Sequence, residues 1–315
     1  MTLNERAQLI ADEAERNATQ LRVHVTKVAG ARVIDCGGAV QGSLAAGLLL
    51  ARACLADAGE VAYVPYPVPE IGGPAVQVTT DDPVRACLAS QYAGWQVTAG
   101  KFFAMGSGPM RALAAREEIF QHISAKEESP FAVGVLETHK HPTEEVIAAI
   151  VAKLPLVAEH LTLMVAPTSS IAGTTQIVAR SVETALHKLH ELKLDVNQVV
   201  SGYGIAPLPP VATDFVQAIG RTNDAILYGA KVVLWVRADD EVLEHIGPKV
   251  PSAASKDHGS PFAEVFARYN GDFYKIDPLL FSPAEIEFRN LKTGRTHRFG
   301  RSEPALLRKS FGLDE

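Results

Sequence analysis

The sequence predicts a mixed α/β (α+β) protein, and two observations lead to this prediction. Short apolar or alternating segments typical of strands recur along the chain, with segments of helical spacing between them. Their order lacks the strict strand–helix–strand repeat of a doubly wound parallel sheet. The composition agrees, because 315 residues with a hydrophobic fraction of 47% and a charged fraction of 21% can build one large or two ordinary globular domains.

The helices are predicted from apolar spacing and from capping residues. In residues 3–19 the apolar side chains recur every three or four positions, and Thr2 or Asn4 can cap that helix. Another helix is predicted to begin at Pro83, because proline fits a first helical position and the two aspartates before it can act as caps. Further helices are predicted at residues 42–57, 143–151, 176–192 and 215–224, and one more within residues 262–299.

The strands are predicted from alternation and from short apolar runs. Residues 21–28 alternate between apolar and polar side chains, which is the pattern of a half-buried strand. The other predicted strands are residues 31–36, 60–64, 75–79, 131–136, 161–165, 199–202, 231–236 and 285–289.

We expect two domains, residues 1–160 and 161–315, which are free to interleave. No shift in composition marks the boundary. Residues 248–261 are rich in serine, proline and glycine, and they are the best candidate for a mobile lid.

Charge and cysteine content exclude several classes of protein. A formal net charge of −6 and a pI of about 5.9 argue against a nucleic-acid partner, which would require a basic face. No apolar run reaches the length of a membrane span, and the N-terminal residues lack the apolar stretch of a secretory signal. Cys36, Cys54 and Cys87 are odd in number and far apart, so we expect three buried thiols in a cytoplasmic protein.

The most informative stretch is residues 91–111, which combines aromatic side chains, Lys101 and a Gly106-Ser107-Gly108 turn. Glycines allow a tight turn and a close approach to a ligand, and free backbone N–H groups there could bind an anion beside the lysine. The alternative interpretation is a tight turn with a solvated lysine and no ligand.

Two further groups of residues are candidates for a site. Arg180 and Glu183 have the i, i+3 spacing that places both side chains on one helix face. A surface ion pair is the simpler interpretation, but residues 167–175, just before them, are small and polar and suited to lining a pocket. The segment that contains Arg221, Asn223 and Asp224 offers a guanidinium, a carboxamide and a carboxylate, which could equally be polar residues at a helix end.

These segments resemble one known family. Residues 91–111, the Arg180-Ser-Val-Glu183 box and residues 202–229 are similar to the methenyltetrahydromethanopterin cyclohydrolases, and the likeness extends over nearly the whole chain. The resemblance implies two α/β-type domains with a ligand cleft between them, in a homotrimer. It also implies a pterin substrate, no cofactor, and no nucleic-acid or membrane partner.

The resemblance implies roles for Glu183 and Arg180 only, and the chemistry of the implied substrate suggests roles for the other candidate residues. Glu183 would be the general acid/base beside the reactive carbon, and Arg180 would orient it. Lys101, Gly106, Ser107 and Gly108 would bind the substrate, either at its anionic tail or near the reaction centre. Arg221, Asn223 and Asp224 would bind the pterin ring, whose donor edge suits the carboxylate of Asp224. No metal is expected, because the cationic substrate is already electrophilic.

Other functions have weaker support in the sequence. The Gly37-Gly38 turn suggests a nucleotide- or dinucleotide-binding oxidoreductase, but it lacks the Gly-x-Gly-x-x-Gly spacing and the acidic residue that should follow. A pterin-binding protein without catalysis is a third possibility. The histidine pairs at 139/141 and 187/190 lack a third metal ligand at a recognisable spacing, and the serines at 169 and 170 lack a nucleophile elbow. The direction of the reaction in the cell stays open.

Overall fold

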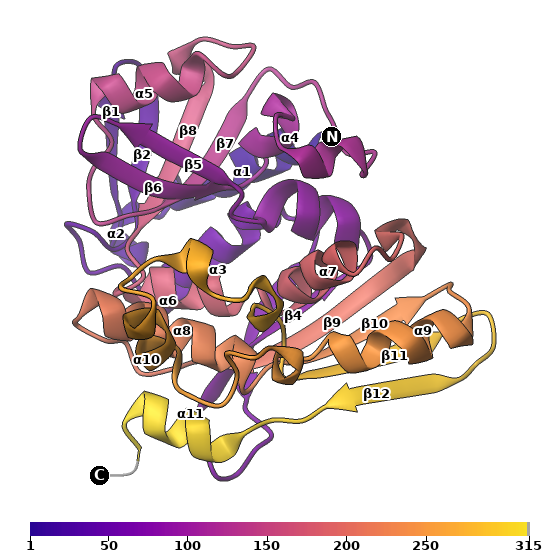
Figure 1. Ribbon diagram of the computed structural model, residues 1–315. Coiled ribbons are helices and arrows are strands. Elements are labelled where there is room, and N and C mark those ends of the chain that lie inside the picture. Colours follow the sequence, from indigo (N-terminus) through magenta and orange to yellow (C-terminus); the bar gives the residue numbers. More distant parts are fainter. Residues whose placement is uncertain (314–315) are drawn as a thin grey trace. The chain divides into compact units, whose positions relative to one another are not determined.

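The computed structural model describes residues 1–313 and divides into two compact units. Unit 1 contains residues 1–60 and 84–176, and unit 2 contains residues 61–83 and 177–315. The units interleave, and the main division lies after residue 176 instead of at residue 160. The reason is that β8, which we had assigned to the second domain, pairs with strands of unit 1. Each unit contains one six-stranded sheet of mixed direction, which confirms the mixed α/β prediction (Figure 1).

The sheet of unit 1 has three parallel strands at its centre. β2, β8 and β7 are parallel neighbours, β1 adds to one side antiparallel, and the β6–β5 hairpin adds to the other. In sheet order the strands are β1 (His24–Val28), β2 (Ala31–Asp35), β8 (Leu161–Ala166), β7 (Ala132–Glu137), β6 (Phe102–Ser107) and β5 (Trp95–Ala99).

Helices cover both faces of this sheet. The first begins with a capping box in which the Thr2 hydroxyl accepts the Glu5 N–H and the Glu5 carboxylate accepts the Thr2 N–H. The helices are α1 (Leu3–Arg16), α2 (Ala18–Leu21), α3 (Leu44–Cys54), the π-helix η1 (Val84–Gln91), α4 (Met110–Ala114), η2 (Glu118–Gln121), α5 (Glu144–Val151) and η3 (Ala158–His160). A further helix, α6 (Ile171–Val178), crosses from unit 1 into unit 2.

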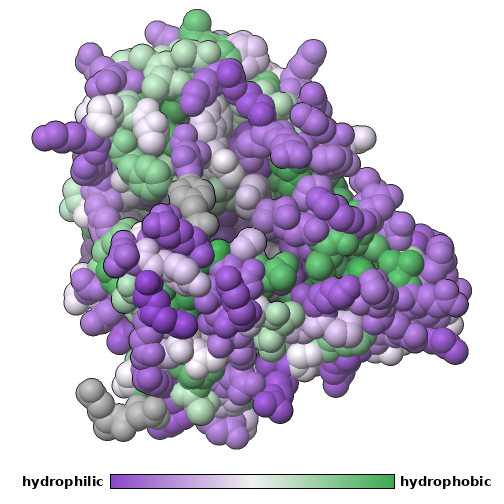
Figure 2. All heavy atoms as spheres, viewed as in Figure 1, coloured by the Kyte–Doolittle hydropathy of each residue, from purple (hydrophilic) through white to green (hydrophobic). Residues whose placement is uncertain are grey.

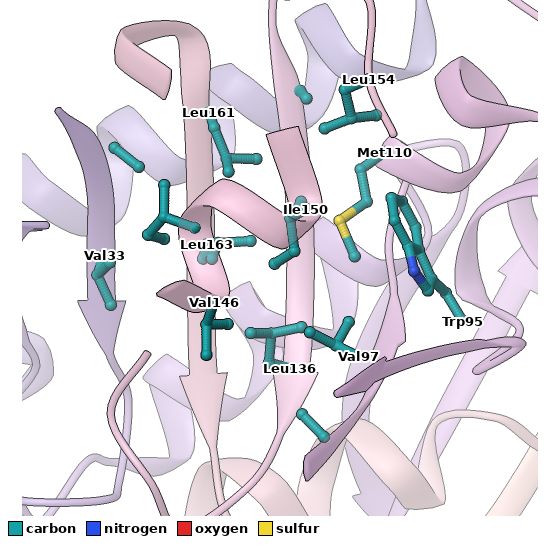
Figure 3. Packing of buried hydrophobic residues seen from close by; sticks show 14 of the residues in the cluster. Val33, Trp95, Val97, Met110, Leu136, Val146, Ile150, Leu154, Leu161 and Leu163 are labelled. Carbon is teal, nitrogen blue, oxygen red and sulfur yellow. The ribbon is translucent and has the colours of Figure 1, made fainter. Parts of the chain in front are cut away.

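The two faces of the sheet pack against separate hydrophobic clusters. Leu163 on β8 belongs to the cluster under α5, where Val146 and Ile150 lie over the strands (Figure 3). The next residue, Met164, belongs to the cluster under α1 and α3. Because both faces are buried, β8 is apolar at nearly every position and does not alternate.

Unit 2 is built on the second sheet, in which β9 and β10 are central. β10 and β11 run parallel, and β9 is antiparallel to both β10 and β4. In sheet order the strands are β12 (Thr296–Gly300), β11 (Glu285–Asn290), β10 (Lys231–Val236), β9 (Val199–Pro207), β4 (Pro74–Thr80) and β3 (Glu60–Pro65).

Unit 2 contains five α-helices and several single turns of 3-10 helix within its described residues. The α-helices are α7 (Ser181–Glu191), α8 (Phe215–Leu227), α9 (Asp240–Ile246), α10 (Phe262–Arg268) and α11 (Pro304–Phe311). The 3-10 turns are η4 (Val196–Gln198), η5 (Gly247–Lys249), η6 (Ser252–Ala254), η7 (Phe273–Lys275) and η8 (Pro278–Leu280). Across residues 1–313, no helix is both long and apolar enough to cross a lipid bilayer. Hydrophilic side chains cover most of the face shown in Figure 2.

Within residues 91–111, where we had expected a ligand-binding loop, residues 95–107 form a β-hairpin. β5 and β6 pair antiparallel, and the chain turns at Gly100 and Lys101. The sequence does carry the alternation of a strand, because the apolar Trp95 and Val97 are buried while the polar residue that follows each of them is exposed. We had not recognised this period of two beneath the glycines and aromatics.

The helix predicted at residues 176–192 is two helices. α6 ends at Val178 and α7 begins at Ser181, with Arg180 as the residue that precedes the first helical position. Arg180 therefore lies at the entrance to α7, and Glu183 lies in its first turn.

The predicted lid, residues 248–261, is attached to the rest of unit 2 along its length. The hydroxyl of Ser252 donates to the Leu227 carbonyl, and Ser255 donates to the Asp277 carboxylate at 2.7 Å. Near its end the Tyr228 hydroxyl donates to the Ser260 carbonyl at 2.5 Å. These bonds fix the segment, and they give no support to a lid.

Arg111 is a fully buried cation that fixes the π-helix η1. Its guanidinium lies at 0% exposure and pairs with the Glu117 carboxylate at 2.8 Å and 2.5 Å. Nη1 donates to the Leu88 carbonyl at 2.9 Å and lies 3.4 Å from the Ser90 carbonyl, near the end of η1. Each of the three guanidinium nitrogens thus donates inside unit 1, which is the condition under which a buried charge is tolerated.

Replacing Arg111 by methionine keeps much of the side-chain volume but leaves the Glu117 carboxylate and the η1 carbonyls without their donor. Urea unfolding should show a loss of about 3–5 kcal/mol, the range observed when one partner of a buried pair is removed. Arg116→Met, at an exposed position nearby, should change stability by about 0.5 kcal/mol or less. Equal effects of the two substitutions would contradict this role for Arg111.

Candidate active site

The two candidate catalytic side chains lie together at the start of α7, and both are buried. Arg180 is 6% exposed and Glu183 is 4% exposed. The Arg180 carbonyl accepts the Thr184 N–H at 2.9 Å, so the backbone at Arg180 already belongs to the first turn of the helix. Such burial excludes an exposed ion pair, which was the simpler interpretation of this spacing.

Glu183 lies at the N-terminal end of α7. Backbone N–H groups at a helix N-terminus have no partner within the helix, and the helix dipole is positive there. Glu183 is the acidic residue of the first turn of α7. The carboxylate of Glu183 is thus shielded from water at the end of the helix that carries the positive dipole.

The small polar segment before this helix bonds mainly to itself. The Ser170 hydroxyl donates to the Pro167 carbonyl at 2.8 Å and accepts the Gly173 N–H at 3.0 Å. The Thr174 hydroxyl donates to the Thr168 carbonyl at 3.0 Å. These hydroxyls shape the turn from β8 into α6, and this explains the small polar residues without a ligand.

Lys101 and the Gly106-Ser107-Gly108 turn lie at opposite ends of β6. Lys101 is exposed at the tip of the hairpin, where its backbone carbonyl accepts the Lys140 ammonium at 2.6 Å. Gly106 and Ser107 are the last residues of β6, roughly 17 Å further along at about 3.4 Å per residue. The lysine and the glycines therefore do not form one anion site.

The Gly106-Ser107-Gly108 turn is buried and its glycines serve packing. Gly108 has φ of +89°, and its N–H donates to the Ser90 carbonyl at 2.8 Å. A Cβ at Gly108 would lie 3.0 Å from the Val133 carbonyl oxygen, so a larger residue would disturb β7. The expectation of N–H groups available to a ligand is not met at Gly108.

Arg221, Asn223 and Asp224 lie on α8, and each bonds to unit 2 itself. The Arg221 guanidinium donates to the carbonyls of Ser310 and Pro210, both at 3.2 Å. The Asn223 amide donates to the Ile219 carbonyl one turn earlier, at 2.9 Å. The structure thus favours the interpretation of polar residues that organise a helix and its neighbours.

Asp224 joins three helices of unit 2. At 0% exposure, its Oδ1 accepts the Phe262 N–H at the start of α10 at 2.8 Å, and its Oδ2 accepts the Ser310 hydroxyl of α11 at 2.6 Å. Burial raises the pKa of Asp224 to about 7, against the lowering effect of these two hydrogen bonds. Glu264 raises it further by charge repulsion.

Lys188, which we had not singled out, is a second buried charge on α7. It is 1% exposed, and its ammonium donates to the Leu279 carbonyl. Burial lowers the pKa of Lys188 to about 8, and the nearby Asp277 acts in the opposite direction. The helical pattern gave a signal for it, because Lys188 falls on the same face as the apolar Ala185 and Leu189.

The Gly37-Gly38 turn is occupied by a side chain of its own segment. The Asp35 carboxylate accepts the N–H groups of Gly37, Gly38 and Ala39 at 3.0, 2.6 and 2.7 Å. A nucleotide phosphate would need these same donors. The carboxylate at the end of β2 therefore removes the structural basis for the dinucleotide-binding alternative.

The histidine pairs do not assemble into a metal site. His187 lies 4.0 Å from Glu191 on the same helix, and His141 lies 3.3 Å from the Thr26 hydroxyl. Among the residues described by the structure, no group of three or more His, Cys, Asp or Glu side chains could hold a metal ion.

Comparison with known proteins gives a family for the chain. The sequence profile of the family described as Cyclohydrolase (MCH) matches residues 2–311. The methenyltetrahydromethanopterin cyclohydrolase of Rhodopirellula baltica is 52% identical over 291 residues, which cover 91% of this chain and 87% of the relative. The chain belongs to this family.

Relatives from different organisms share this similarity. The methenyltetrahydromethanopterin cyclohydrolase of Methylobacterium organophilum is 46% identical over 309 residues, covering 96% of this chain and 94% of the relative. That of Methanococcoides burtonii is 40% identical over 317 residues, covering 99% of each. The family resemblance predicted from the sequence is confirmed, and the oxidoreductase alternative has no support.

The raised pKa of Asp224 predicts a pH-dependent stability. Between about pH 4 and pH 7 the unfolded chain loses this proton before the folded protein does, so rising pH should lower the free energy of unfolding by up to a few kcal/mol. Asp224→Asn keeps an acceptor for Phe262 and should remove this slope. Denaturant unfolding at pH 5 and pH 8 measures both proteins, and an identical pH dependence in the two would contradict the assignment.

Proposed function

We propose that this chain catalyses the reversible hydrolysis of 5,10-methenyl-tetrahydromethanopterin to 5-formyl-tetrahydromethanopterin, with Glu183 as general acid/base. Membership of the cyclohydrolase family supports the reaction. The observation that supports the residue is the burial of Glu183 and Arg180 in one helical turn. Buried charges are costly for a fold, and such groups cluster at functional sites.

The reaction requires one carboxylate that can accept and return a proton. The substrate carbon between N5 and N10 belongs to a cationic amidinium, so water can attack it directly. Glu183 takes a proton from the attacking water as the C–O bond forms, and it returns that proton to N10 as the C–N10 bond breaks. The hydroxyl proton of the tetrahedral adduct leaves to solvent, and the formyl group stays on N5.

Arg180 acts on the carboxylate in this proposal. A guanidinium nearby favours ionised Glu183 and restricts its orientation, which a carboxylate needs to meet the water in one geometry. Arg180 can also hold the water itself, since a guanidinium offers several donors.

The residues proposed to bind the substrate differ in how well their positions suit that role. Lys101 has an exposed side chain, and it stays our candidate for an anionic tail or for a group nearer the reaction centre. Gly106, Ser107 and Gly108 contribute by shaping the end of β6. Arg221, Asn223 and Asp224 contribute by fixing α8 against its neighbours, and pterin binding by Asp224 stays a proposal only.

Glu183→Gln tests the proposed function. The amide keeps the shape of the side chain but cannot accept the proton of water, so kcat should fall by about a hundredfold or more while KM changes little. Glu191→Gln, at the exposed far end of the same helix, is the matched control and should stay within about twofold of the parent. If Glu183→Gln turns over within a fewfold of the parent at saturating substrate, Glu183 is not the general base.

We also propose metal-independent catalysis in a cytoplasmic homotrimer. Metal independence rests on the chemistry, because a cationic amidinium carbon needs no further polarisation. The assembly rests on the family resemblance, and the location rests on the three buried cysteines, which form no disulfide.

Dialysis against a strong chelator should therefore leave the rate of methenyl-tetrahydromethanopterin hydrolysis unchanged. The measurement is the loss of the methenyl chromophore before and after dialysis, with circular dichroism as a check of folding. A loss of activity that returns on adding Zn²⁺ would contradict the proposal.

A further inference from the structure

Two glycines of β9 face the helix that carries the proposed catalytic pair. Gly202 and Gly204 alternate along the strand and therefore point to the same side of the sheet. Tyr203 between them points to the other side, where it packs against the cluster that contains Tyr66 and Ile205 and its hydroxyl donates to Gln77 at 3.3 Å. The first turn of α7 contacts the glycine side.

This contact is closer than ordinary side chains allow. A Cβ placed on Gly202 would lie 2.7 Å from Cγ1 of Val182, and one placed on Gly204 would lie 2.9 Å from Cγ2 of the same residue. The Gly204 Cβ would come closer still to the Ser181 hydroxyl. Carbon atoms in contact are normally about 3.5–4.0 Å apart. Ser181 and Val182 therefore occupy the space where β9 would otherwise carry side chains.

The strands on each side of β9 do carry side chains at these positions, so the glycines form the floor of a trough. Val78 and Val232 are the register partners of Gly204. Thr80 and Leu234 are the register partners of Gly202. The trough receives the start of α7, and Figure 1 shows this helix running over β9 and β10.

Ser181 and Val182 are also the two residues between Arg180 and Glu183. In a helix, residues this close are rigidly coupled, because the backbone turn fixes the position of each relative to the next. We infer that Gly202 and Gly204 are positioning residues for the reaction, since they set the depth at which the first turn of α7 lies and so the placement of Arg180 and Glu183. This inference rests on the proposed role of Glu183.

The geometry predicts how sensitive the reaction is to this contact. A methyl group at Gly202 would push the first turn of α7 outward by about 1 Å to restore a normal carbon contact. A displacement of that size between a catalytic group and its substrate can reduce a rate by about a hundredfold. Substrate groups held elsewhere would keep their contacts.

Gly202→Ala tests the inference by steady-state kinetics. We expect kcat to fall about tenfold or more, KM to stay within about threefold, and the pH profile of kcat to shift, because the carboxylate changes its distance from Arg180. Val182→Ala in the Gly202→Ala background removes the clashing methyl, and it should restore kcat to within about threefold of the parent. A purely structural role would lower the melting temperature without moving kcat of the folded enzyme or its pH profile.

Two controls separate displacement from general damage. Gly247→Ala also clashes in unit 2, there with the Phe299 ring of β12, and should lower stability while leaving kcat within about twofold. If Gly202→Ala does not fold, Val182→Ile adds bulk to the same contact from the helix side and should give the same fall in kcat.

The outcomes distinguish this inference from the proposed function. Unchanged kcat in Gly202→Ala and Val182→Ile, with Glu183→Gln inactive, would overturn the positioning role alone. An active Glu183→Gln would overturn the function on which it rests. A fall in kcat without rescue by Val182→Ala would also overturn the inference.

Discussion

The cost of removing a charge from water is the constraint on which much of this structure depends. Arg111, Asp224 and Lys188 lie inside the protein, and each has polar partners aligned with its donors or acceptors. An unpaired charge in such a place costs several kcal/mol, so each buried charge dictates the arrangement of the segments around it. Arg111 fixes the end of a π-helix, and Asp224 holds three helices together.

The same constraint explains how one turn looks like a nucleotide site without being one. A loop with two consecutive glycines and free N–H groups attracts an anion. Asp35, at the end of β2, is an anion supplied by the chain itself, and it accepts three of these N–H groups. The glycines of this turn therefore serve the fold, and their sequence pattern alone could not distinguish the two uses.

Much of the fold could be predicted from local patterns, because period and capping are local properties. β10 has the bounds that apolar spacing indicated, and Thr2 caps α1 as expected. The β5–β6 hairpin was missed because its alternation is hidden by the glycines and aromatics around it. The division of the chain into two units after residue 176 could not be predicted from the sequence either, because it depends on which strands pair across long stretches of chain.

The environment of the candidate site could not be predicted from the sequence. Spacing placed Arg180 and Glu183 together, yet the break between α6 and α7 and the burial of both side chains depend on tertiary packing. For Lys101, closeness in sequence to Gly108 suggested one site shared by both residues, and the structure does not bring them together. An extended strand separates them, because six residues of β-structure span far more than six residues of a loop.

A buried, oppositely charged pair suits a reaction on a cationic substrate. A lone carboxylate in an apolar place would take up a proton and lose its power as a base, whereas a nearby guanidinium keeps it ionised. The guanidinium must not bind so tightly that the carboxylate cannot turn to the water, so the distance between the two groups matters as much as their presence. Where the Ser181 and Val182 side chains pack directly on a glycine floor, the first turn of the helix has little room to shift, because the strand side of the contact is backbone. In the proposed mechanism, the packing of α7 on β9 and the proton transfer by Glu183 are therefore parts of one arrangement.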